Sequence, residues 1–211
     1  PGSTIPMPQG NAQIARAEFE GPHPAGLPGT HIHFLAPVSE TRSTWYVGAQ
    51  DVAAIGALFT TGVLSVERVV ALAGPIVSQP RLLRTRLGAS LDQLTEDQLS
   101  EKRARIISGS VFGGRTGRDA LAYLGPYHQQ VSCLKEGDDR EFMHFMRAGT
   151  NKHSVLNIFT SALDRTRRMD MTTTTNGSPR AMVPVGNFEE VMPLDILPTQ
   201  LLRYLVVGDV E

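Results

Sequence analysis

This chain of 211 residues has little that would support disulfide bonds, membrane insertion or electrostatic attachment. Its single cysteine, Cys133, excludes an intrachain disulfide and any cluster held by several cysteines of this chain. No apolar run approaches the roughly 18 residues of a membrane-spanning helix, and no signal peptide is visible. A formal net charge of −1 gives no field that would hold nucleic acid or an anionic membrane. These absences leave a globular protein of one or two compact domains.

Recognisable catalytic motifs are missing as well. The glycine-rich stretch from Gly109 to Gly117, with Arg115 and Arg118, suggests a cradle for phosphate. However, the chain lacks both the Gly-Lys-Ser/Thr ending of a P-loop and a Gly-x-Gly-x-x-Gly turn between a strand and a helix. A flexible loop between strands explains the same residues, and we favour it. No nucleophile elbow or zinc-protease motif occurs either.

The pattern of apolar residues nevertheless predicts regular structure. Residues 31–38 form a short β-like run, and residues 50–61 carry apolar side chains at helical spacing. Gly62 follows as a candidate C-cap. We therefore expect a strand and then an amphipathic helix in the first third of the chain.

A second unit follows with a different order of elements. Strands are predicted at 69–73, 81–87 and 106–112, with a helix over 91–99 that begins after Ser90 as its N-cap. Strand, turn, strand, helix, strand is the order of a β-grasp fold.

The last part of the chain contains a turn signal and a closing helix. Four threonines run into Asn176-Gly177, and an apolar segment follows. Asn-Gly supplies the positive φ angles of a two-residue turn, so we expect a β-hairpin here. Residues 197–207 are predicted to be helical, whereas no structure is assigned to 134–166.

His31 and His33 have the only spacing typical of a metal site. On a strand they would share one face and could bind one metal, with His23 as a third ligand from the loop. The simpler interpretation is hydrogen bonding around a glycine-rich turn. We favour it because the spacing alone provides no third ligand.

Six segments together resemble a known family, the A subunit of the bacterial Na+-translocating NADH:quinone oxidoreductase, a respiratory sodium pump. The resemblance runs from about Glu20 to Asp209. The segments are Gly21–Leu35, Arg68–Pro75, Ile107–Val111, Tyr123–Ser132, Met171–Gly186 and Val191–Thr199.

The resemblance implies an α+β protein in three parts. Residues 1–67 would be the end of an α/β domain, and 68–135 a β-grasp of the soluble-ligand-binding type. Residues 136–211 would be an extension with the hairpin and the closing helix. The stretch Leu72–Pro80 resembles the opening of that β-grasp domain, which also occurs in the flavoprotein subunit of respiratory complex I. We expect the chain to be a fragment of the family's full-length protein without its N- and C-terminal portions.

The family also implies a function. NADH would be oxidised on another subunit, and electrons would pass through flavins and iron–sulfur centres to ubiquinone while the complex exports Na+. This chain would be a peripheral subunit on the cytoplasmic face of the bacterial inner membrane, held there by the other subunits. We expect it to bind no redox cofactor of its own, to contribute no catalytic residue and to have no nucleic-acid partner.

Tyr127, His128 and Gln129 are the candidate quinone contacts. Quinone carbonyls need hydrogen-bond donors, and an aromatic side chain can stack on the ring. The alternative is a strand with alternating exposed polar residues. Pro126 stands where an arginine is expected in the family, which removes a donor and a charge from this loop.

Two other functions remain open. The chain could be a non-catalytic β-grasp module that binds a small ligand or acts as a scaffold. It could also be a metal-dependent enzyme built on His31 and His33.

Overall fold

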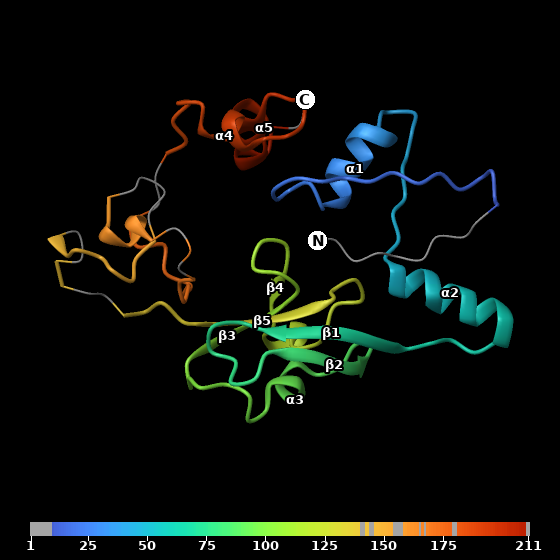
Figure 1. The fold of residues 1–211 in the computed structure, drawn as a ribbon, viewed down its shortest axis with the longest axis horizontal. Helices are drawn as coiled ribbons and strands as arrows, with labels where there is room; N and C mark the ends of the chain where they lie inside the picture. Colours follow the sequence, from blue (N-terminus) through green and yellow to red (C-terminus); the bar gives the residue numbers. More distant parts are fainter. Residues whose placement is uncertain are drawn as a thin grey trace. The chain divides into compact units, whose positions relative to one another are not determined.

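The computed structural model describes residues 10–139, 142–143, 146–153, 158–164, 166, 168–178 and 181–209. Figure 1 shows its elements along the chain. The helices are α1 Pro28–Leu35, α2 Ala49–Thr61, α3 Leu91–Thr95, α4 Asn187–Val191 and α5 Pro198–Val207, with 3-10 turns η1 Asp119–Leu121 and η3 Thr160–Leu163. The strands are β1 Glu67–Ala73, β2 Arg81–Arg86, β3 Ala104–Ser108, β4 Arg115–Thr116 and β5 Gln130–Lys135.

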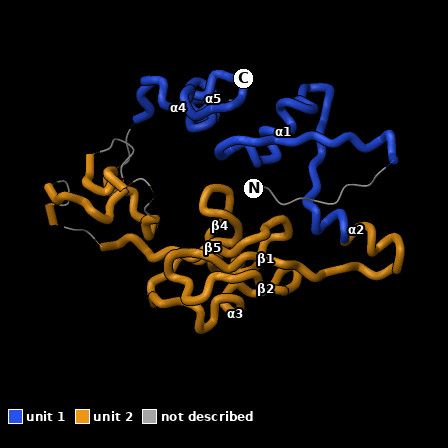
Figure 2. Tube along the Cα trace, viewed as in Figure 1, with its two compact units in different colours: residues 1–53, 179–211 blue, residues 54–178 orange. Residues whose placement is uncertain are grey.

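The chain divides into two compact units (Figure 2). One consists of residues 1–53 together with 179–211, and the other of residues 54–178. Helix α2 contributes residues to both units. The division at residues 67 and 135, which follows from the family resemblance, stays a prediction.

The second unit is built around one five-stranded sheet. Its strand order is β2-β1-β5-β3-β4. β1 pairs antiparallel with β2 and parallel with β5, while β3 pairs antiparallel with both β4 and β5. The predicted order of strand, turn, strand, helix and strand is confirmed as β1, β2, α3 and β3. β1 and β5, the first and last strands of the sheet, lie parallel at its centre, as in a β-grasp.

One face of the sheet and helix α3 enclose the core. Val70, Leu72, Val131 and Cys133 alternate along β1 and β5 and are fully or almost fully buried, together with Leu91 of α3. Burying such a side chain contributes about 1.5–3 kcal/mol. The core therefore holds β5 firmly, and with it the loop that precedes this strand.

Two sequence predictions around the first helices had different outcomes. The helix over 50–61 is confirmed as α2, and Gly62 ends it with φ +73° and an N–H bond to the carbonyl of Leu58 at 2.8 Å. The strand over 31–38 is wrong, because residues 28–35 form helix α1. Pro28 is favourable at the start of a helix, and Thr30 Oγ1 donates to the carbonyl of Pro24 at 3.0 Å.

The predicted hairpin around Asn176-Gly177 is not found in described residues 168–178 and 181–209, where no strand occurs. Asn176 does adopt the expected positive φ of +53°. Thr172, however, forms an isolated parallel bridge with Lys135 at the end of β5. Pro184 follows the turn and cannot donate to a ladder, which disfavours a returning strand.

The remaining predictions differ mainly in their ends. The helix after Ser90 ends at Thr95 rather than at residue 99, and β3 covers 104–108 rather than 106–112. The closing helix is confirmed as α5, which ends at Gly208 with φ +73°. Within the described part of the chain, no helix combines the length and hydropathy that crossing a bilayer requires.

Candidate functional site

The three predicted quinone contacts lie in the loop that precedes β5, rather than in a strand of alternating polar residues. Tyr127 is 79% exposed, and Gln129 is exposed as well. The carbonyl of Gln129 accepts a hydrogen bond from the N–H of Ala71 at 2.9 Å, which ties the loop to β1. Only His128 is turned towards the protein, where it is half-buried. Along the loop, an exposed aromatic residue precedes the half-buried His128 and an exposed amide residue follows it.

His128 is held by Ser108 at the end of β3. Ser108 Oγ lies 2.7 Å from His128 Nδ1, so one hydrogen bond joins them. The same oxygen accepts the backbone N–H of Gly125 at 2.9 Å. Ser108 is fully buried, and the antiparallel register sets it opposite Val131, which is fully buried too.

Two glycines leave the space that the imidazole fills. A Cβ atom on Gly109 would lie 3.1 Å from His128 Cδ2, and one on Gly125 would lie 2.5 Å from Nδ1. Gly109 also has φ +99°, a conformation that favours glycine over residues with a side chain. The ring is therefore enclosed by backbone on two sides, and its position depends on the absence of side chains there.

The electrostatics around His128 favour its neutral form. Burial lowers the pKa of His128 from its ordinary value, and the nearby positive charge of Arg115 lowers this pKa further. A neutral imidazole has one N–H donor and one acceptor nitrogen. At neutral pH the site can therefore donate a single hydrogen bond without carrying a charge.

The arginines of the glycine-rich stretch do not converge on a common site. Arg115 Nη2 donates to the carbonyl of Tyr123 at 3.3 Å, whereas Arg118 Nη2 lies 2.8 Å from Glu136 Oε1. Ser110 Oγ accepts the N–H of Gly113 within the loop. These contacts agree with the interpretation of a loop between strands β3 and β4.

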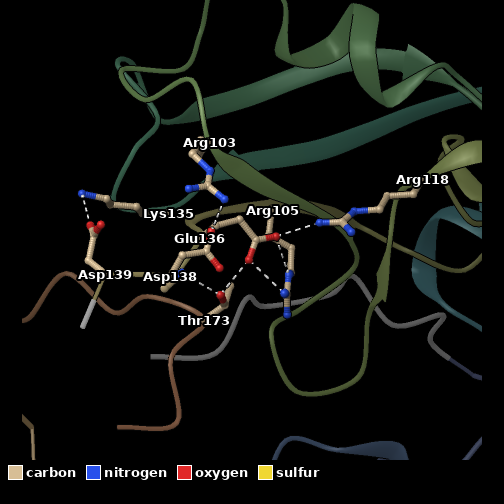
Figure 3. Close-up of polar contacts among 9 residues, drawn as sticks. Arg103, Arg105, Arg118, Lys135, Glu136, Asp138, Asp139 and Thr173 are labelled. Atoms are coloured by element: carbon tan, nitrogen blue, oxygen red, sulfur yellow. Dashed lines mark hydrogen bonds and ion pairs between the residues drawn. The ribbon is translucent and has the colours of Figure 1, made fainter.

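Glu136 is the centre of the polar contacts drawn in Figure 3. Its carboxylate accepts two bonds from Arg105, at 3.0 and 2.9 Å, one from Arg118 and one from Thr173 Oγ1 at 2.8 Å. Its side chain is only 13% exposed. The hydrogen bond from Arg105, followed by the bond from Thr173 and the two arginine charges, lowers the pKa of Glu136. These bonds connect Arg105 of β3 and Arg118 after β4 with Glu136, which directly follows β5, and with Thr173. The cluster therefore ties the threonine segment 172–175 to the sheet.

His31 and His33 do not have the strand geometry that would place both imidazoles on one face for a metal. Both lie on helix α1, where residues two positions apart do not face each other. The Nε2 atom of His31 lies 2.8 Å from the carbonyl oxygen of Ala25, and its ring centroid is 4.4 Å from that of Phe19. Among the described residues, no group of three His, Cys, Asp or Glu side chains is arranged to hold a metal, including one with His23.

A depression of about 330 Å³ lies elsewhere on the second unit. None of the three predicted quinone contacts lines it. Its lining residues are Thr85, Arg86, Ala89, Ser90, Gln93 and Leu94.

Sequence reasoning missed three residues of the His128 site: Ser108, Gly109 and Gly125. Both segments that contain them carried the family resemblance, but nothing in the sequence indicated that they meet. Their juxtaposition comes from the pairing of β3 with β5.

Comparison with known proteins identifies the family. Residues 1–64 match the family described as "NqrA second alpha/beta domain", and residues 69–118 match "NQRA C-terminal domain". A protein of Pseudomonas aeruginosa, named as the A subunit of Na(+)-translocating NADH-quinone reductase, is 68% identical over 94% of this chain and 44% of its own length. Proteins of the same name from Cellvibrio japonicus and Hahella chejuensis are 62% and 59% identical over 99% and 100% of the chain, and over 46% and 47% of their own lengths. The chain belongs to the NqrA family.

The predicted family is thereby confirmed, as is the α+β class. The chain spans about half the length of the curated NqrA relatives it matches. The two family matches also separate the helical segment with α1 and α2 from the segment with strands β1 to β4.

Proposed function

We propose that this chain serves in a sodium-pumping NADH:quinone reductase, as part of its peripheral NqrA subunit. The observation that carries this proposal is 59–68% identity, over 94–100% of the chain, to proteins that bear this name. In such a complex, NADH is oxidised on another subunit, and electrons pass through flavins and iron–sulfur centres to ubiquinone while Na+ is exported. The chain docks to the other subunits on the cytoplasmic face of the membrane and carries no redox cofactor of its own.

Within this function, the loop Tyr127–Gln129 contacts ubiquinone. A quinone carbonyl accepts hydrogen bonds and carries no formal charge, which suits a half-buried imidazole whose lowered pKa keeps it neutral. Tyr127 is 79% exposed and offers a ring for stacking, and Gln129 offers an amide N–H. Ligand sites commonly combine apolar surface with a few such polar groups.

A titration with a soluble short-chain ubiquinone tests the quinone contact. Backbone amide shifts of this chain, followed by NMR, are expected to saturate and to cluster at residues 127–129 and at Ser108 and Gly109. The His128→Ala variant should lose most of this response. His153→Ala is the matched control, because His153 is an exposed histidine outside the loop.

Two outcomes would count against parts of the proposal. Absence of shifts at millimolar ubiquinone would remove the quinone contact and leave the chain as a docking or scaffolding β-grasp module. A stoichiometric flavin bound to this chain would contradict the assignment of a subunit without its own redox centre. Co-purification of the chain with the membrane subunits tests docking separately from both.

A further inference from the structure

We propose that Ser108 is a positioning residue that fixes His128 in the tautomer with its hydrogen on Nε2. The site then presents a single N–H donor to a neutral carbonyl ligand. The tautomer follows from the geometry of this chain alone. Only the identification of the ligand as a quinone rests on the proposed function.

The assignment comes from counting the hydrogens around Ser108 Oγ. This hydroxyl is fully buried and has one hydrogen to donate. It already accepts the N–H of Gly125 at 2.9 Å, and its other partner in the described structure is His128 Nδ1 at 2.7 Å. If Nδ1 carried a hydrogen, the oxygen would accept twice and its own hydrogen would be buried without a partner. Because unpaired buried donors are strongly disfavoured, the hydroxyl donates to Nδ1, and Nδ1 is the acceptor.

The remaining hydrogen of the neutral ring is then on Nε2. No described residue makes a hydrogen bond with this nitrogen, and the ring is half-buried. Gly109 and Gly125 lie against the Cδ2 and Nδ1 edges of the ring and limit its rotation. Ser108 thus sets which nitrogen donates, and the two glycines set where the ring lies.

The same arrangement selects the chemical class of the ligand. A charged imidazolium would need N–H donors on both nitrogens, which would reverse the bond from Ser108 and leave its hydrogen unpaired. The positive charge of Arg115 opposes that form as well. A site held neutral with one donor matches a neutral carbonyl oxygen better than a carboxylate or phosphate, which draws its affinity from charge.

Long-range 1H–15N correlation of the His128 ring tests the tautomer directly. In the unmodified chain at neutral pH, Nδ1 is expected at the downfield position of an unprotonated ring nitrogen and Nε2 at the upfield position of a protonated one. The Ser108→Ala variant should show a mixture of tautomers and a higher His128 pKa, whereas Ser108→Thr, which keeps the hydroxyl, should restore the single tautomer. Ser110→Ala is the matched control, since this neighbouring serine bonds Gly113 rather than the histidine.

A protonated Nδ1 in the unmodified chain would overturn the proposal, and so would a Ser108→Ala spectrum identical to that of the unmodified chain. If Ser108→Ala fails to fold, the unmodified chain and Ser108→Thr still decide the question. Titration with ubiquinone then tests the quinone contact separately from the role of Ser108 in setting the tautomer. The expected loss in Ser108→Ala is about fivefold in affinity, the effect of one neutral hydrogen bond. A correct tautomer without quinone shifts would reject the quinone contact and keep the role of Ser108.

Discussion

The five-stranded sheet and helix α2 both carry regularly spaced apolar residues, but these residues are buried in the sheet and exposed in α2. Val70 and Leu72 in β1 are 0% and 1% exposed. In α2, Ile55 and Phe59 are 49% and 85% exposed, and no residue of the helix is buried. Periodicity alone therefore marks an apolar face without telling how much of it the chain covers. The sheet and α3 cover each other, so we expect the stability of the chain to be concentrated there.

The polar contacts show the same contrast. In α2, Thr60 and Thr61 donate to carbonyl groups three or four residues earlier. In the sheet unit, Glu136 bonds Arg105 and Thr173, which are 31 and 37 residues away. The bonds in α2 stay within one helix, whereas those of Glu136 connect separate segments of the fold. Changes in the sheet unit should therefore affect stability more than changes in α2.

The largest expected difference in stability loss is between substitution of a core residue and substitution of an exposed residue of α2. Leu72→Ala should lower the free energy of unfolding by about 2–5 kcal/mol, because it leaves a cavity in the core. Phe59→Ala should change it by about 0.5 kcal/mol or less, because the ring is 85% exposed. Urea denaturation followed by circular dichroism measures both. Equal losses in the two variants would show that α2 is as well packed as the sheet.

Glycine-to-alanine substitutions are expected to change stability in opposite directions in the two regions. Gly125→Ala should destabilise the chain by about 1–3 kcal/mol, because the new Cβ would lie 2.5 Å from His128 Nδ1. Gly56→Ala should stabilise α2 by about 0.5–1 kcal/mol, because nothing lies within 4 Å of a Cβ at that helical position. Thermal unfolding of both variants, with ring shifts of His128 for the first, measures the effect. A stable Gly125→Ala variant with an unmoved imidazole would contradict the enclosure of the ring.

The Glu136 cluster should contribute less to the stability of the chain than the core does. Glu136→Gln keeps the size of the side chain but removes its charge, and we expect a loss of about 1–2 kcal/mol. Amide exchange at residues 172–175 should become faster, since Thr173 loses its charged partner. Glu67→Gln is the matched control, because the Glu67–Arg84 pair is exposed and should contribute little. Unchanged exchange in Glu136→Gln would show that the threonine segment is held by other contacts.

The smallest effects should appear in the pH dependence of stability. The pKa of His128 is lowered, so the unfolded chain binds more protons and stability falls as the pH drops below the ordinary histidine value of about 6.5. The pKa of Glu136 is lowered as well, so its contribution is present above the ordinary glutamate value and is lost at more acidic pH. Denaturation midpoints followed from neutral to strongly acidic pH should show two steps. His128→Gln should remove the first step. Glu136→Gln should reduce the second step, to which the lowered pKa of Glu189 also contributes. A variant that keeps its full step would assign that step to another group.

Several elements could be predicted from local pattern because their causes are local. Helix α2 with Gly62, helix α5 and the order β1, β2, α3 and β3 follow from apolar spacing and from the positions of glycine and proline. The sequence predicts neither β4 nor β5. The prediction of a strand over 31–38 is wrong because a short apolar run does not distinguish a strand from a helix. At Asn176 the turn residue adopted its predicted φ, but Thr172 pairs with Lys135 instead of a returning strand.

Neighbouring residues and the residue sequence of whole segments are enough to assign the family, the α+β class, helices α2, α3 and α5, and strands β1 to β3. Which distant residues meet depends on the tertiary structure. Ser108 and His128 are 20 residues apart, and Glu136 and Thr173 are 37 apart. These pairs meet because strands β3 and β5 pair in one register and because Thr172 bridges the end of β5. Register depends on which face of each strand the core buries and on turn geometry, and β3 and β5 are not joined by a tight turn that would set it locally.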